Sequence, residues 1–148
     1  MEQNTATRVP ANAAWLGGLG ALPFIGLALL SIFSNLNDAL ALLALSAYGA
    51  VILSFLGGIH WGLAIGRAPD APSTAALILS VVPSLIGWVA LLLERELGLL
   101  VLAAAVAAMF FVDTNLTQRR MAPIWYPRLR LPLTLTVVTC LLGSALAA

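Results

Sequence analysis

The sequence predicts an all-α membrane protein, a polytopic bundle of five transmembrane helices. Only 9% of its 148 residues are charged and its mean hydropathy is +1.03, whereas an ordinary soluble domain carries about 25% charged residues. Its long uncharged runs suit the roughly 20 apolar residues that a helix needs to cross a bilayer. These runs do not alternate apolar and polar residues, as the strands of a membrane barrel do.

The first two predicted helices cover residues 13–33 and 39–65, and they open a single membrane domain of residues 13–148. A polar tail of residues 1–12 comes first. The first helix is longer than the apolar region of a cleaved signal peptide, which has about 7–15 residues, so we expect it to be retained. The segment Asn35–Asp38 supplies a turn and an N-cap for the second helix.

The last three predicted helices cover residues 74–93, 97–112 and 131–147. Inside hydrocarbon, each backbone N–H and C=O must be paired within its own segment, which favours helices. A solvated hairpin at residues 94–96 joins the third helix to the fourth. A longer loop, Thr114–Pro132, joins the fourth to the fifth, and we expect its prolines to stop the helices from continuing.

The arginines predict the orientation of the bundle. Six lie at one end and one at the other, and positively charged loops stay on the cytoplasmic side, so we expect the N-terminus in the cytoplasm and the C-terminus outside. The six are Arg8, Arg67, Arg119, Arg120, Arg128 and Arg130, and the seventh is Arg95. The aromatic residues expected at the headgroup level are Trp15, Trp61, Trp125 and Tyr126 on the inner side and Trp88 on the outer side.

The composition and the absence of known motifs also exclude several classes of function. A net charge of +1 is too balanced for a nucleic-acid-binding protein. A single cysteine, Cys140, excludes an intrachain disulfide and a thiolate metal cluster, and one histidine cannot by itself form a zinc or haem site. The sequence contains no Gly-rich phosphate loop, HExxH or GxSxG motif. We therefore expect no metal, no cofactor and no enzyme activity.

Small residues recur every four positions in the second predicted helix. The series is Ser46, Ala50, Ser54, Gly58, Gly62 and Gly66. Small residues in this register let two membrane helices approach closely. We interpret the series as helix packing within the chain, and the alternative is the seam of a homodimer or a docking face for another membrane protein.

Pro23 and Pro83 lie near the midpoints of the first and third predicted helices. A proline removes one backbone hydrogen bond and leaves the carbonyl four residues earlier in need of another partner. We therefore expect structural kinks at these two positions. Paired interruptions of corresponding helices can also mark a transport site, and this alternative stays open.

His60 is the only ionisable residue well inside a predicted span. Because ionisable groups are costly in the membrane, such a residue is a candidate functional residue. One interpretation is a neutral imidazole that is hydrogen-bonded to a neighbouring helix. The other is a site that accepts a proton or contacts a ligand, such as a quinone headgroup or a lipid phosphate.

Asp113 ends the fourth predicted helix at the same level as His60. A carboxylate there opposes the helix dipole and needs a cation, which we expect from the loop arginines in a structural clasp. Proton transfer is the alternative, and an intramembrane enzyme would need His60 and Asp113 within hydrogen-bond reach. The loop arginines also attract anionic lipid, by about 1 kcal/mol for each basic residue. The candidate functional cluster at the cytoplasmic face is His60, Trp61, Asp113, Arg119, Arg120, Trp125, Tyr126, Arg128 and Arg130.

Four parts of the chain together resemble a known family. They are YGAVILSFLGGIHWG at residues 48–62, PSLIGW at residues 83–88, Asp113, and PxWYxxLRxxLT at residues 123–134. The combination is similar to a small polytopic membrane family of unknown function, the transmembrane protein 69-like family of proteobacteria and mitochondria. The resemblance implies no particular activity. It implies the bacterial inner (cytoplasmic) membrane as the location, and the mitochondrial inner membrane for organellar relatives.

Two functions fit these observations. The first is a non-enzymatic accessory or assembly protein, which binds other membrane proteins through its small-residue series and its inner loop. The alternative is a small transporter or a lipid- or quinone-binding protein that uses His60 and the Pro23 and Pro83 kinks. A sealed apolar bundle would favour the first function, and an open vestibule lined by Asp113 and the loop arginines would favour ligand handling.

Overall fold

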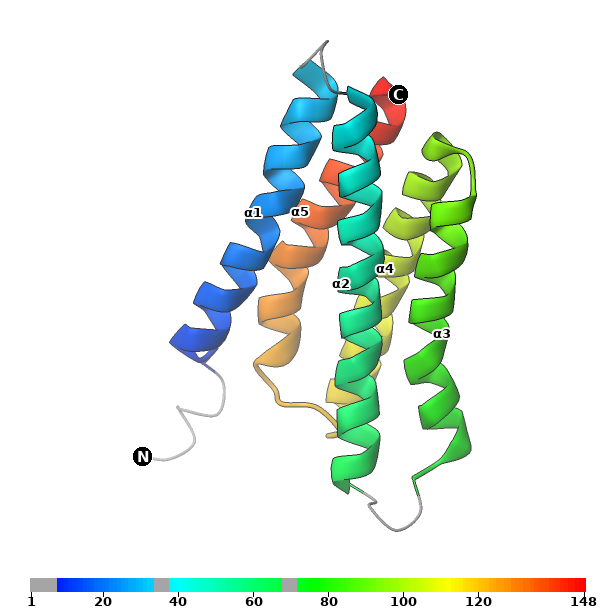
Figure 1. Cartoon of the computed structure of the whole chain (residues 1–148). Coiled ribbons are helices and arrows are strands. Elements are labelled where there is room, and N and C mark those ends of the chain that lie inside the picture. The colour runs from blue at the N-terminus through cyan, green and yellow to red at the C-terminus, as the bar shows by residue number, and fades with distance from the viewer. Residues whose placement is uncertain (1–7, 34–37, 68–71) are drawn as a thin grey trace.

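The computed structural model describes residues 8–33, 38–67 and 72–148, which form five α-helices and, within these ranges, no strand. Consecutive helices run in opposite directions (Figure 1). All five are long and apolar enough to cross a membrane, which confirms the predicted all-α membrane bundle. They are α1 (Ala11–Phe33), α2 (Asp38–Arg67), α3 (Thr74–Leu92), α4 (Arg95–Gln118) and α5 (Tyr126–Ala147). The start of the predicted tail and the turn at residues 34–37 lie outside the described residues.

The helices close into a ring in which α1 packs on α2 and α5, α3 packs on α2 and α4, and α4 packs on α5. In addition, α2 contacts α4 across the ring. The starts of α1, α3 and α5 share one end of the bundle with the last turns of α2 and α4 (Figure 1). We call this the arginine-rich end, because the arginines of the α4–α5 connection lie there, whereas Arg95 begins α4 at the opposite end.

Large apolar side chains fill the centre of the bundle and also cover its outside. Phe24, Leu53 and Leu141 are at most 1% exposed, and they come from three different helices. By contrast, Phe111 is 71% exposed and Leu146 is 87% exposed. Water-soluble monomers rarely show apolar patches beyond a few hundred Å². Lipid tails, however, solvate such a surface without cost, so the exterior suits hydrocarbon.

Side-chain hydrogen bonds fasten α1 to its two neighbours. The hydroxyl of Tyr48 in α2 donates to the backbone carbonyl of Gly20, 2.9 Å away, and its ring centroid lies 4.8 Å from that of Phe24. Nearer the end of α1, Ser31 shares a buried hydrogen bond of 2.9 Å with Ser144 of α5. Polar side chains therefore hold α1 in place along much of its length.

Both α4 and α5 extend beyond the uncharged runs, so the predicted loop of residues 114–132 shortens to residues 119–125. An uncharged run marks only the part of a helix that lies in hydrocarbon, and the polar turn beyond it can remain helical. Thr114 and Thr117 illustrate this, because each hydroxyl donates to the backbone carbonyl four residues earlier, at 2.8 and 3.0 Å.

The prediction that the loop prolines stop the helices is wrong for Pro127 and Pro132, which both lie inside α5. Pro127 occupies the first turn, where its missing N–H would have had no helical partner. Prolines deeper in a membrane helix are tolerated when neighbouring groups satisfy the freed backbone. Pro23 and Pro83 lie inside α1 and α3, as predicted.

The backbones of α2 and α3 come close together at two glycines. A Cβ atom added to Gly57 of α2 would overlap the backbone oxygen of Ser80. A Cβ atom added to Gly87 of α3 would lie only 3.2 Å from the backbone of Ala50. This contact therefore depends on the absence of a side chain at both glycines.

The predicted packing series divides into two parts. Ser54 shares a hydrogen bond of 2.8 Å with Ser84 of α3. Gly58, Gly62 and Gly66, which we call the open stripe, have no described atom within 4 Å of an added Cβ. The prediction that these three glycines pack within the chain is therefore wrong. Each four-residue step turns about 40° around a helix of 3.6 residues per turn, so the series rotates away from α3.

We expect Gly57→Ala to destabilise the bundle by about 1–3 kcal/mol, the usual cost of overpacking, because the new methyl group must push α3 away. The matched variant Gly58→Ala should be neutral or slightly stabilising, since alanine exceeds glycine in helix propensity by about 1 kcal/mol. Denaturant unfolding in one detergent measures both variants. Equal losses of stability at the two positions would contradict the described α2–α3 contact.

Candidate functional site

Three helices each bring one ionisable side chain to the same buried point. The Nε2 atom of His60 in α2 lies 2.7 Å from Oδ1 of Asp113 in α4, and Nε of Arg130 in α5 lies 2.7 Å from Oδ2. We call these residues the buried charge cluster, and they are 4%, 0% and 7% exposed, respectively. Asp113 therefore pairs with one of the four predicted arginines, and His60 lies within hydrogen-bond reach of it.

The buried position of Asp113 explains why it needs two partners. An isolated charge in an apolar interior is very costly, and removing one member of a buried ion pair typically costs about 3–5 kcal/mol. Both carboxylate oxygens are engaged, one by α2 and the other by α5. The cluster thereby fixes α2, α4 and α5 relative to one another near the arginine-rich end.

The contact with Asp113 also decides where His60 carries a hydrogen. An ionised carboxylate only accepts hydrogen bonds, so Nε2 of His60 is the donor. The other ring nitrogen, Nδ1, is buried and has no hydrogen-bond partner among the described residues. One of the two interpretations of His60, an imidazole hydrogen-bonded to a neighbouring helix, corresponds to this contact with Asp113.

Four buried side-chain atoms in the described part of the chain lack a hydrogen-bond partner, and all belong to the cluster or its surroundings. They are Nδ1 of His60, Oη of Tyr126, Nη2 of Arg130 and Oγ1 of Thr134. Tyr126, Arg130 and Thr134 are spaced by four residues and share one face of α5. Buried polar atoms nearly always have a partner, and an unpaired one costs about 1–3 kcal/mol. These atoms therefore make this part of the bundle the candidate functional site.

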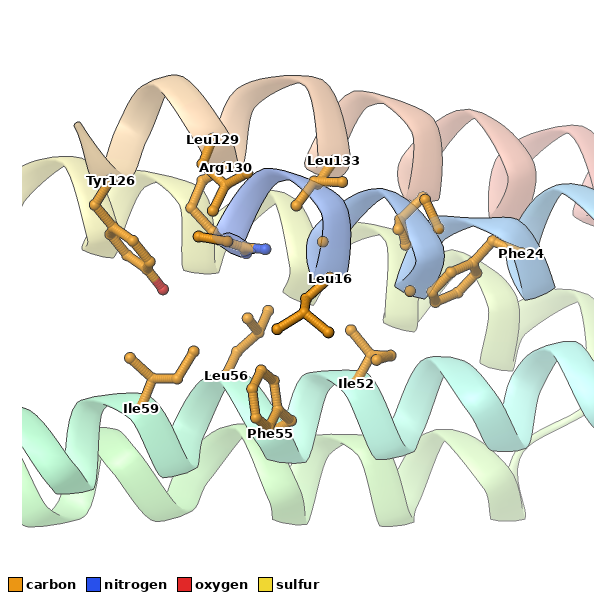
Figure 2. A pocket seen from close by; sticks show the side chains of 15 residues that line it. Leu16, Phe24, Ile52, Phe55, Leu56, Ile59, Tyr126, Leu129, Arg130 and Leu133 are labelled. Carbon is orange, nitrogen blue, oxygen red and sulfur yellow. The ribbon is translucent and has the colours of Figure 1, made fainter. Parts of the chain in front are cut away.

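A cavity of about 320 Å³ between α1, α2 and α5 reaches two of these residues, Tyr126 and Arg130. Both side chains extend from α5 toward α2, where Leu56 lies opposite (Figure 2). The lining residues Leu16 and Phe55 are 71% and 63% exposed, so the cavity opens on the outer surface of the bundle. The remaining lining residues are Ala13, Gly17, Gly20, Ala21, Phe24, Ile52, Ile59, Leu129, Leu133 and Val137.

The other members of the predicted functional cluster lie nearer the surface. Trp61 is 42% exposed and Trp125 is half-buried. The exposed arginines are Arg119, Arg120 and Arg128. Tyr126 was expected at the headgroup level, but its side chain turns inward and is only 8% exposed. No group of three metal-ligating side chains comes together within the described ranges.

Sequence reasoning missed Thr134 and the cavity. Thr134 follows Tyr126 and Arg130 at helical spacing, and this spacing was the signal that could have found it. The cavity owes part of its space to Gly20 of α1, which lines it without a side chain. Pro23 and Pro83, the predicted kinks, are not among the residues that line it.

Residues 9–146 match a family model described as "Protein of unknown function (DUF3429)". The chain belongs to this family. Two curated relatives share the description transmembrane protein 69, and each is similar over 91% of this chain. The relative from Xenopus tropicalis is 37% identical over 139 residues, and the one from Mus musculus is 29% identical over 141 residues. The chain spans about half the length of these relatives, 54% and 58%. No solved structure matches it.

The family match confirms the resemblance that the sequence motifs indicated. The matched residues run from Val9, just before α1, to Leu146 in the last turn of α5. The buried charge cluster and the cavity therefore both lie within the family's domain. The family's description names no activity, so a function must be inferred from the site itself.

We expect Asp113→Ala to lower the free energy of unfolding by about 3–5 kcal/mol, because Arg130 keeps a buried charge without a counter-ion. The double variant Asp113→Ala with Arg130→Met removes both charges and should recover much of that loss. A double-mutant cycle of unfolding measurements in one detergent gives the coupling energy. Simple additivity of the two single losses would argue against a direct ion pair.

Proposed function

We propose that this chain is a non-enzymatic membrane protein that binds one amphipathic molecule from the bilayer in the cavity between α1, α2 and α5. The main support for this proposal is the distribution of polar and apolar residues around the cavity. Two residues that each carry an unpaired buried polar atom, Tyr126 and Arg130, line an otherwise apolar space. Ligand sites are typically apolar clefts of about 300–1,000 Å³ with a few placed polar groups.

The position of the cavity along the bundle axis supports a lipid-like ligand. Tyr126 and Arg130 belong to the first turns of α5, near the arginine-rich end, whereas Phe24 and Val137 line the cavity nearer the middle of the bundle. An amphipathic lipid has the same order of polar and apolar parts along the membrane normal. Its apolar part would fill the space beside Phe24, and its polar end would meet α5.

The location that we propose is the bacterial inner (cytoplasmic) membrane, with the arginine-rich end in the cytoplasm. The uneven distribution of arginines supports this orientation, because positively charged loops stay on the cytoplasmic side. The exposed arginines of the α4–α5 connection would also attract anionic headgroups, by about 1 kcal/mol each. A ligand could then enter sideways from the inner leaflet, past Leu16 and Phe55.

For the buried charge cluster we propose a positioning role rather than a catalytic one. Both oxygens of Asp113 already accept hydrogen bonds of 2.7 Å. The bond to Nε holds the guanidinium of Arg130 in place, Arg130 lines the cavity, and its Nη2 atom has no described partner. This arrangement supports binding, because it offers a fixed polar contact to a ligand.

Filling the cavity tests the proposal. We expect Gly20→Leu to reduce the amount of co-purified ligand about tenfold, since its new side chain occupies the cavity at a cost to binding of about 1.4 kcal/mol. Wild-type and variant proteins would be purified from native membranes, and their bound small molecules quantified by mass spectrometry.

The matched control for this experiment is Gly18→Leu. Gly18 is exposed, lies on the same helix and has no described atom within 4 Å of an added Cβ, so this variant should retain the ligand. Thermal unfolding would confirm that both variants fold. The proposal fails if the wild type carries no enriched molecule, or if both variants carry the same amount as the wild type.

The open stripe supports a second function, that of an accessory or assembly protein. Gly58, Gly62 and Gly66 present an uncovered strip of backbone on α2. Small residues at this spacing allow a helix of another membrane protein to pack closely, by dispersion contacts and weak interhelical hydrogen bonds. The three glycines lie on the same helix as His60 but outside the cavity, so the two functions use separate surfaces.

Bulky substitutions in the open stripe test this second function. We expect Gly62→Leu to abolish co-purification of partner proteins from native membranes while leaving membrane insertion intact, because leucine prevents close helix contact. The control is Gly26→Leu, which puts the same side chain on an equally open glycine of α1. Unchanged co-purification with Gly62→Leu would remove this function, and equal losses in both variants would show that the effect is not specific to the stripe.

A further inference from the structure

We infer that the polar end of the ligand is uncharged and presents a carbonyl oxygen to Tyr126 and Arg130. This inference rests on the ligand site proposed above and names the chemistry that the site selects. Both residues are more than nine-tenths buried, at 8% and 7% exposure, and both line the cavity. Each also carries a polar atom without a partner among the described residues.

The two unpaired atoms favour an acceptor on the ligand. Nη2 of Arg130 can only donate hydrogen bonds, and the phenol of Tyr126 can donate one as well. They are one helical turn apart on the same face of α5, and both side chains extend toward α2 (Figure 2). A carbonyl oxygen has two lone pairs, so a single carbonyl can accept from both donors.

The charge balance disfavours an anion. The charge of Arg130 is already compensated by Asp113, whose carboxylate lies 2.7 Å from its Nε. Apart from Tyr126 and Arg130, every residue that lines the cavity is apolar or glycine. A phosphate or carboxylate would therefore enter without a counter-ion of its own, and burial of an unpaired charge is strongly unfavourable. A neutral carbonyl avoids this cost and still accepts a charge-assisted hydrogen bond.

The volume of the cavity limits how much of the ligand, beyond its carbonyl, can lie inside the protein. At about 320 Å³, it lies at the lower end of the range of about 300–1,000 Å³ for small-molecule sites. It can hold a compact headgroup and the beginning of one chain, with the remainder passing between Leu16 and Phe55 into the bilayer. The ligand class is thus an uncharged single-chain lipid with a carbonyl, of which alkyl quinones and monoacyl esters are two sources.

Three probes with chains of the same length distinguish these chemistries: a decyl-substituted benzoquinone, monodecanoylglycerol and decyl phosphate. Binding to the full chain in phosphatidylcholine nanodiscs would be measured by titration calorimetry. The heat measured with nanodiscs that contain the Gly20→Leu variant would be subtracted, to remove the signal from partition of the probe into the lipid. We expect one or both uncharged carbonyl probes to bind, and decyl phosphate to bind at least tenfold more weakly. The tighter of the two uncharged probes identifies the source of the carbonyl.

The two tyrosines of the chain provide matched variants. Tyr126→Phe should weaken binding of the carbonyl probe about fivefold, for the loss of one hydrogen bond, and should leave the unfolding temperature of the free protein unchanged, because that hydroxyl has no described partner. Tyr48→Phe should do the opposite. Its hydroxyl donates to Gly20 and it does not line the cavity, so stability should fall while affinity stays the same.

Two results would overturn the inference. One is binding of decyl phosphate as tight as that of the uncharged probes, and the other is wild-type affinity in Tyr126→Phe. If decyl phosphate bound to the wild type and not to Gly20→Leu, the proposed cavity site would stand and only the carbonyl assignment would fail. If none of the probes bound and native membranes yielded no enriched ligand either, the proposed function would fail as well.

Discussion

The bundle and its candidate site both depend on the burial of one carboxylate. Asp113 has no exposed surface, and the outer faces of the bundle suit hydrocarbon rather than water. Lipid cannot hydrate a charge, so the protein itself must compensate it. His60 and Arg130 do so from two other helices, with one contact to each carboxylate oxygen. The two contacts that compensate Asp113 therefore fix the rotation of α2, α4 and α5 about their axes and their relative positions along the bundle.

Under the proposed function, the same contacts prepare the cavity for a ligand. Arg130 is held through Nε, and its Nη2 atom remains without a described partner. On the opposite side Gly20 contributes space, and its carbonyl accepts the hydrogen bond from Tyr48 that ties α1 to α2. A bound molecule could thus supply the missing hydrogen bonds without disturbing the ion pair. Structural stability and ligand binding would then use different atoms of the same guanidinium.

Hydrophobicity predicted the five helices because only long uncharged segments can cross a bilayer. The need of Asp113 for a cation was also predictable from its place at a helix end. The choice of Arg130, and the meeting with His60 across 53 positions of the chain, depend on how each helix is rotated about its axis, which no local pattern determines. Helix rotation also explains why Gly57 packs on α3 whereas the open stripe does not. Gly57 follows Ala50 by seven residues, about two helical turns, and so stays on the face that packs on α3.

Solid-state nuclear magnetic resonance of the chain in lipid bilayers, with nitrogen labels in histidine and arginine and carbon labels in aspartate, can detect the buried charge cluster itself. Since the chain has one histidine, all imidazole nitrogen signals come from His60, and correlations within the ring distinguish Nδ1 from Nε2. We expect a hydrogen on Nε2 of His60 and through-space correlations from the carboxyl carbon of Asp113 to that nitrogen and to Nε of Arg130. An Nε2 atom without a hydrogen, or an Asp113 carboxyl group with no correlation to either side chain, would show that the buried charge cluster does not form as described.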